Sequence, residues 1–181
     1  MPDETYTQNL PEVDPTEIED TRTTTAIASE HQSFLEKVMV KSGFGDLYDA
    51  RDFSEVVFRV MRDLMTTETI ERVEGELHEE VMPTKEKALQ MEVADLWKDT
   101  NPIVGFLSRI RQPLRGPAPI GIDSNLFLTR IANEGALPPT VQPEQALQAV
   151  FSATKDELSE ERIQEIATCL PDQVRQLWEQ A

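Results

Sequence analysis

The chain has 181 residues and a formal net charge of −17 at pH 7, because 34 Asp and Glu side chains outnumber 17 Lys and Arg. That length suffices for one or two domains with a hydrophobic core, while seven glycines and a single cysteine exclude collagen-like and disulfide-rich chains. The negative charge argues against binding to nucleic acid, since phosphate contacts require clustered Lys and Arg.

Residues 1–28 form an acidic segment with few apolar side chains. Seven acidic residues stand there against Arg22 alone. The few apolar side chains bury too little surface to offset the entropy that the chain would lose on ordering. We therefore expect a disordered tail. The segment lacks the basic and apolar regions of a signal peptide, and no apolar run in the sequence approaches the roughly 18 residues of a membrane span. We therefore expect a cytoplasmic protein without membrane insertion.

Residues 29–111 show helical periodicity throughout. Ser29 is expected to cap a first helix that ends at Gly43, and Asp52 precedes a long amphipathic helix from Phe53 to Met65. Thr66 or Thr67 is expected to begin a third helix. The apolar positions that carry this third helix are Ile70, Val73, Leu77 and Val81, before Pro83.

Two further helices are predicted in the same range. Leu89, Val93, Leu96 and Trp97 mark the fourth helix, which Asn101 and Pro102 end. A short fifth helix begins at Pro102, whose fixed φ suits a first helical position.

Residues 112–122 hold three prolines and two glycines, which predict a linker rather than a helix. Three arginines lie on or beside it: Arg109, Arg111 and Arg115. One interpretation is that these cations pair with acidic faces of the protein itself. The other is that they dock a partner protein, with the prolines keeping the segment extended at low entropic cost.

Residues 123–181 return to helical periodicity. Asp123 or Ser124 caps a helix that Gly135 closes, and Pro143 opens a long helix with inward positions from Ala146 to Leu158. Ser159 begins the next helix. The last helix starts at Pro171 and Asp172 and carries Val174, Leu177 and Trp178.

The two halves read alike at an offset of about 93 positions. Phe34-Leu35-Glu36-Lys37-Val38 matches Phe127-Leu128-Thr129-Arg130-Ile131, and Phe58 pairs with Phe151. We therefore expect an all-α fold of two homologous helical-bundle repeats packed together, comprising residues 29–111 and 123–181.

The pattern resembles a bacterial family known as domain of unknown function 2267, whose members are all-helical and often tandem. The second half carries the resemblance in Phe127–Ile131, in Glu157-Leu158-Ser159-Glu160-Glu161, and in the Leu-Pro start and Trp end of Leu170–Trp178. The first half departs from the pattern, because His78 rather than proline follows Leu77 and the tryptophan comes late. The resemblance implies a fold and brings no activity, substrate or catalytic residue.

Chemistry-bearing residues are sparse. His31 and His78 lack the Glu-x-x-His spacing of di-iron bundles, and Met82 stands where a His-Glu-x-x-His zinc motif would need its second histidine. Cys169 lies on a predicted apolar helix face, where burial makes a thiol inert. We expect no cofactor and no metal.

The favoured interpretation is a non-enzymatic binding, scaffold or regulatory protein, with Arg109, Arg111 and Arg115 as the candidate docking residues for an unidentified protein partner. The alternative is a small metal-dependent hydrolase. Its residues would be His78 together with Glu74, Glu79 or Glu80.

Overall fold

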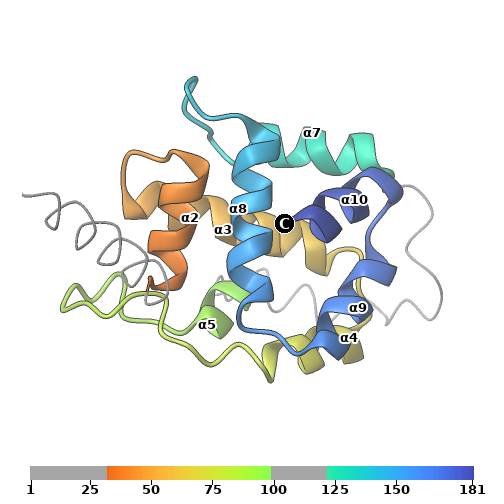
Figure 1. Cartoon of the computed structure of the whole chain (residues 1–181), viewed down its shortest axis with the longest axis horizontal. Helices are drawn as coiled ribbons and strands as arrows, with labels where there is room; N and C mark the ends of the chain where they lie inside the picture. The colour runs from red at the N-terminus through yellow and green to blue at the C-terminus, as the bar shows by residue number, and fades with distance from the viewer. Residues whose placement is uncertain (1–31, 99–121) are drawn as a thin grey trace, which may run out of the picture. The chain divides into compact units, whose positions relative to one another are not determined.

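Every regular element in the part of the chain that the computed structural model describes, residues 32–98 and 122–181, is a helix, which confirms the all-α prediction. No strand occurs in these two ranges, where an isolated antiparallel bridge joins Glu80 and Glu92. Figure 1 shows the helices in chain order: α2 (Phe34–Ser42), α3 (Leu47–Arg62), α4 (Thr67–Glu74), α5 (Val93–Trp97), α7 (Ser124–Glu134), α8 (Pro143–Lys155), α9 (Glu160–Cys169) and α10 (Asp172–Gln180).

The first helix, α2, starts at Phe34 with Ser33 as its N-cap, so the expectation of a cap at Ser29 is wrong for this helix. The Ser33 amide donates to Glu36 Oε2 at 2.9 Å, which completes a capping box that sequence reasoning overlooked. At the other end Gly43 adopts φ +82, a left-handed conformation that favours glycine, and this confirms the predicted stop.

The long helix α3 begins earlier than predicted. Asp46, rather than Asp52, is its N-cap, and the Asp46 carboxylate accepts the amides of Tyr48 at 2.8 Å and Asp49 at 2.9 Å. The helix ends at Arg62, three residues before the predicted end at Met65. Asp46 and Asp52 are both suitable N-cap residues by type. Asp46 is the N-cap because its carboxylate reaches two amides that have no partner within the helix.

The third helix starts where the sequence predicts, with Thr66 as N-cap, but α4 ends at Glu74 instead of continuing toward Pro83. Leu77 and Val81 are buried as expected, yet they lie in an irregular segment. The main chain of Val81 pairs outside any helix, because its amide donates to Met91 O at 2.9 Å and its carbonyl accepts from Leu35 N at 3.1 Å.

The helix α5 is shorter than predicted. It covers only five residues and begins after Glu92, whereas Leu89 is buried in a preceding turn. Apolar spacing placed Leu89 on this helix because the spacing does not distinguish a helical turn from a turn outside a helix.

The second half agrees closely with the sequence. Asp123 caps α7 by accepting the Leu126 amide at 2.8 Å, Pro143 is the first residue of α8, and Ser159 caps α9. The predicted inward positions of α8 are all buried: Ala146, Leu147, Val150, Phe151, Thr154 and, just beyond the helix, Leu158.

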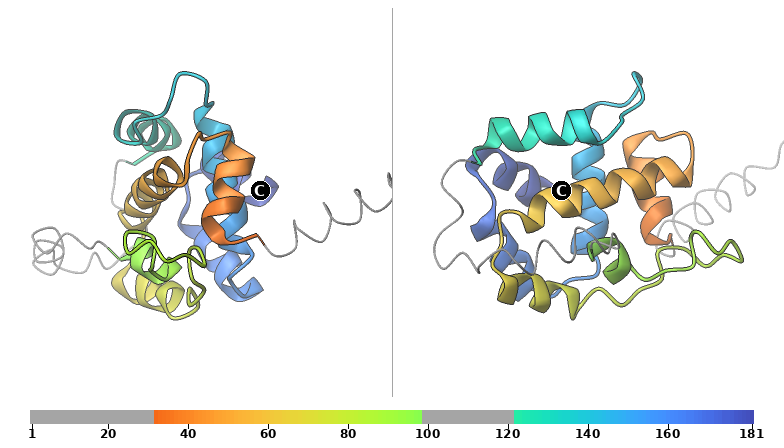
Figure 2. Two further views of the ribbon diagram at one scale, coloured as in Figure 1. Left: turned by 90° about the vertical axis from the view of Figure 1, so that its left-hand side faces the viewer. Right: turned by 180° about the vertical axis from the view of Figure 1, so that it is seen from behind.

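One hydrophobic core runs through both described ranges. In the compact unit Ser33–Ala181, α2 packs chiefly against α8, α7 packs against α3, and α4 contacts α9. Figure 1 shows α2 beside α8, and Figure 2 shows α7 alongside α3. The first helix of each half therefore rests on the long helix of the other half.

Two aromatic pairs fill the core at corresponding places. Phe58 meets Trp97 edge to face at 5.2 Å between ring centroids, and Phe151 meets Trp178 in the same way at 5.0 Å.

Several predictions lie outside the described residues, namely the tail of residues 1–28, the helix expected at Pro102 and nearly all of the linker of residues 112–122.

Candidate functional site

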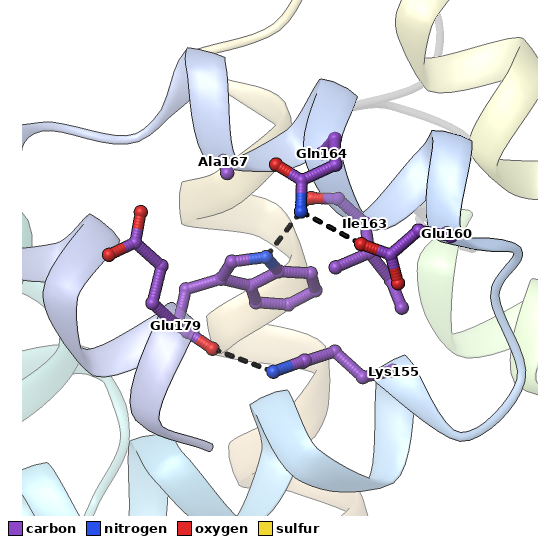
Figure 3. A pocket seen from close by; sticks show the side chains of 7 residues that line it. Lys155, Glu160, Ile163, Gln164, Ala167 and Glu179 are labelled. Carbon is purple, nitrogen blue, oxygen red and sulfur yellow. Dashed lines mark hydrogen bonds between the residues drawn. The ribbon is translucent and has the colours of Figure 1, made fainter.

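A small pocket opens where α8, α9 and α10 meet, with a volume of about 240 Å³ (Figure 3). Its volume is below the roughly 300–1,000 Å³ of sites for drug-sized ligands. The lining residues are Lys155, Glu160, Ile163, Gln164, Ala167, Trp178 and Glu179.

Two polar side chains of the pocket, Lys155 and Gln164, are hydrogen-bonded to the main chain or to another lining residue. Lys155 Nζ donates to the carbonyl oxygens of Trp178 at 3.1 Å and Ala181 at 2.8 Å, and lies 5.9 Å from the centre of the indole ring of Trp178. Gln164 Nε2 donates to Glu160 Oε1 at 2.8 Å (Figure 3). Lys155 Nζ thus makes two hydrogen bonds to main-chain carbonyls at the C-terminal end of the chain.

The indole of Trp178 is a structural part of the pocket wall. Its Nε1 donates to Ile163 O at 3.1 Å, and the residue is 1 % exposed, so almost none of the indole is open to solvent. The corresponding bond in the first half runs from Trp97 Nε1 to Ile70 O at 3.2 Å. The indole ring therefore packs between helices as part of the core, and it is not an exposed surface on which a ligand could stack.

A second cluster of charged groups joins α4 to α9. The guanidinium of Arg162, a residue only 8 % exposed, pairs with Glu76 at 3.3 Å and also with Glu161 and Glu165. From the facing helix, Arg72 Nε donates to Glu165 Oε1 at 3.1 Å. The hydrogen bond from Arg72 lowers the pKa of Glu165, which keeps this carboxylate ionised.

The same corner includes the start of α9. Glu76 accepts from the Ser159 amide at 2.8 Å and from Ser159 Oγ at 3.0 Å. A glutamate from the first half therefore adds to the cap of a helix in the second half, where a negative charge is stabilised by the helix dipole. The cluster joins the two halves by placing two arginines, Arg72 and Arg162, among the carboxylates of Glu76, Glu161 and Glu165.

The most perturbed acid is Glu157, in the turn after α8. Its Oε2 is buried with no hydrogen-bond donor in reach among the described residues. Burial and, to a smaller extent, the nearby carboxylate of Glu79 raise the pKa of Glu157 to about 8, while Lys37 opposes the shift. A carboxyl that stays protonated near neutral pH can act as an acid or can report pH.

Sequence reasoning missed Glu157, although a signal was available. Glu157 stands three residues after Thr154 and seven after Val150, so helical spacing places it on the apolar face of α8. A charged residue at an inward position is uncommon unless it is paired, and that mismatch could have identified the site.

The predicted docking residues Arg109, Arg111 and Arg115 lie outside the described residues. The residues of the hydrolase alternative lie within the described part of the chain. His78, Glu79 and Glu80 are exposed, and Glu74 forms an ion pair with Lys98 at 3.0 Å. Within residues 32–98 and 122–181, no group of three or more His, Cys, Asp and Glu side chains could hold a metal ion.

Cys169 lies near the end of α9 and is partly buried. Its thiol donates to Glu165 O at 3.5 Å, and burial raises the pKa of the thiol. Such a shift disfavours the nucleophilic thiolate at neutral pH.

Comparison with protein-family models matches residues 31–177 to the family described as uncharacterized conserved protein (DUF2267). The search of curated proteins found no match. None of the helices in the described ranges is long and apolar enough to cross a membrane.

Proposed function

We propose that this chain, which belongs to the DUF2267 family, is a non-enzymatic cytoplasmic protein of bacterial origin that binds and scaffolds or regulates a protein partner. On this proposal a linker of residues 112–122 joins two related helical units, residues 29–111 and 123–181, and a cationic docking segment lies on and beside that linker. The docking residues are Arg109, Arg111 and Arg115, and the partner presents an acidic surface.

The observation that carries the proposal is the distribution of positive charge. Residues 109–115 contain three arginines and no Asp or Glu, in a chain whose formal net charge is −17. Elsewhere, arginines of the described residues are engaged in intramolecular pairs, as for Arg130 with Asp63 at 2.8 Å and Arg162 with Glu76 at 3.3 Å. Local cations of this kind suit recognition of an anionic surface, since opposite charges steer association and set its specificity.

A quantitative pull-down tests the proposal. The full chain is compared as bait with the R109A/R111A/R115A variant in lysate of the native cells, at several salt concentrations. We expect a protein that is captured by the wild type, is lost with the triple variant, and dissociates as salt screens the contact over the Debye length of about 8 Å.

The matched control is the K41A/K85A/K87A variant, which removes three exposed lysines and the same charge. It should retain the captured protein. Identical capture by all three baits would contradict the docking role of the arginines. Stoichiometric zinc or iron in the purified protein would instead favour the metal-dependent alternative.

A further inference from the structure

The pocket between α8, α9 and α10 has an equivalent place in the first half. Trp178 Nε1, in the pocket wall, donates to Ile163 O at 3.1 Å. Trp97 Nε1 donates to Ile70 O at 3.2 Å. The two accepting isoleucines stand 93 positions apart, which is the spacing at which the halves correspond. Trp97 and Trp178 are therefore equivalent residues, although a different number of positions separates them in the sequence.

Two positions close to the tryptophan differ between the halves. Ala167 lines the pocket, and Glu74 stands at its equivalent position, 93 residues earlier. Glu179 and Lys98 also correspond, because each directly follows the tryptophan of its half. The first half thus has a carboxylate and an ammonium where the second half has a methyl group and a carboxylate.

In the first half these two side chains bind each other. Lys98 Nζ lies 3.0 Å from Glu74 Oε1, and the Lys98 side chain is 49 % exposed, so about half of it is covered. The hydrogen bond with Glu74 raises the pKa of Lys98 and keeps its ammonium charged. The place that is equivalent to the pocket is therefore occupied by an alkyl chain that carries a positive charge.

In the second half the same place holds no lysine. Ala167 is too short to fill the pocket, and a volume of about 240 Å³ remains. Within the described ranges no ion pair or hydrogen bond engages the Glu179 carboxylate, and Figure 3 shows it apart from the side chains of Lys155 and Glu160. Glu179 is therefore an acid that lacks a partner beside an open space.

The charges around the pocket favour a cation. Glu160 and Glu179 supply two carboxylates against the single ammonium of Lys155. That ammonium already donates to two main-chain carbonyls, which reduces its repulsion of a second cation. The chain as a whole has a formal net charge of −17, and the field of this charge raises the local concentration of cations.

We propose that the pocket binds an alkylammonium group, the chemical equivalent of the Lys98 side chain, presented by a lysine of a peptide or by a free amine. The charge of this group pairs with Glu179, and its methylene groups contact Ala167 and Ile163. The pocket is too small for a drug-sized molecule, and a single extended side chain suits its volume. This proposal does not depend on the arginine docking function.

The indole NH signals provide the test, because the chain has only two tryptophans, one at the pocket and one at the equivalent place. The ¹⁵N-labelled full chain is titrated into the millimolar range with butylamine or with a blocked Gly-Lys-Gly peptide, and the signals are followed by NMR. The same peptide with its lysine acetylated is the uncharged control.

We expect the Trp178 signal to shift and saturate with at least one charged probe, while the Trp97 signal, at the occupied place, does not move. A response to butylamine alone would identify the ligand as a free amine, and a response to the peptide would identify a lysine side chain. If neither charged probe moves the Trp178 signal, or if the acetylated peptide moves it equally, the proposal is overturned.

Substitution of Glu179 tests the assigned contact. E179Q should weaken binding by about two- to fivefold, which is the effect of losing an exposed ion pair. E144Q removes the same charge outside the pocket and should bind as the wild type does. The A167E/E179K variant recreates the pair of the first half and should abolish the shift, and E179Q keeps the comparison available if the double variant does not fold. Equal affinity of E179Q and E144Q for the charged probe would overturn the proposal.

The Lys98→Ala variant tests the equivalence of the two places. It removes the ammonium from the first half and leaves Glu74 without this partner. We expect the charged probe to move the Trp97 signal in this variant as well as the Trp178 signal. A Trp97 signal that still does not respond in the folded variant would overturn the equivalence on which the proposal rests.

Discussion

Gly135 packs so closely against Phe53 that a β-carbon at Gly135 would lie 2.8 Å from two atoms of the phenyl ring. It would also stand 2.5 Å from the Ile131 carbonyl oxygen. Phe53 is fully buried on α3 and Gly135 ends α7, so the contact sets how closely the first helix of the second half approaches the long helix of the first.

The Gly135→Ala variant should therefore lose stability. Overpacking of this kind costs typically 1–3 kcal/mol, because the backbone of α7 or the ring of Phe53 must move. Denaturant unfolding followed by circular dichroism measures the change. Gly45→Ala is the matched control, since a β-carbon there meets no atom within 4 Å, and an equal loss in both variants would contradict the role of the close contact.

The paired aromatic residues Phe58 and Phe151 should each contribute strongly to stability. Both are fully buried, and each packs edge to face on the tryptophan of its own half. Truncation to alanine should cost on the order of 3–5 kcal/mol in the free energy of unfolding. The control is Leu126→Ala, at a residue 43 % exposed, which should cost far less. Midpoints of denaturation close to wild type for Phe58→Ala or Phe151→Ala would contradict the assigned packing.

The elements that sequence predicted best are those whose signals are local. Pro143 and Ser159 mark their helix starts by their own chemistry, and the apolar face of α8 is continuous from Ala146 to Thr154. Gly43 ends α2 because its φ of +82 suits glycine. Each of these helix boundaries and faces is determined by a few neighbouring residues, so it can be predicted from the sequence alone.

The elements that sequence reasoning misjudged are those decided by distant partners. Leu77 and Val81 have helical spacing, but the Val81 carbonyl accepts from Leu35 and its amide donates to Met91, so this segment is not a helix. The sequence also did not predict that the first helix of each half packs on the long helix of the other half. Apolar spacing identifies the buried face of a helix, but it does not identify which helix covers that face.

The buried Arg162 should be sensitive to substitution. Its guanidinium pairs with three carboxylates, and Arg162→Ala would leave Glu76, Glu161 and Glu165 close together without their common cation. We expect a loss of about 1–3 kcal/mol, less than for a fully buried pair because water reaches these carboxylates. Arg162→Lys should recover only part of this loss, since an ammonium cannot reproduce the guanidinium fork.

Thermal and denaturant unfolding of both Arg162 variants measure these changes. Arg51→Ala is the control, because Arg51 pairs with the neighbouring Asp52, which is largely exposed, and such pairs contribute about 0–1 kcal/mol. If Arg162→Ala were no less stable than Arg51→Ala, the α4–α9 cluster would not stabilise the junction between the halves.

Glu157 links stability to pH. Burial and the neighbouring Glu79 raise its pKa in the folded protein to about 8, from an ordinary value of 4.5 that applies when the chain is unfolded. Between these two values the folded chain holds a proton that the unfolded chain has released. The contribution of Glu157 is therefore fully present below about pH 4.5 and is lost as pH rises through 8.

The Glu157→Gln variant should remove this dependence, because an amide does not titrate. Relative to the wild type, the variant should gain on the order of 1–3 kcal/mol between pH 5 and pH 9, because solvent reaches the rest of the side chain and weakens the penalty of ionisation. Denaturant unfolding at intervals across this range, with the difference between variant and wild type plotted against pH, cancels the titration of the other groups. Glu144→Gln, an exposed glutamate at the start of the same helix, should give a flat difference. A flat difference for Glu157→Gln as well would mean that Glu157 ionises in the folded protein as it does in the unfolded chain.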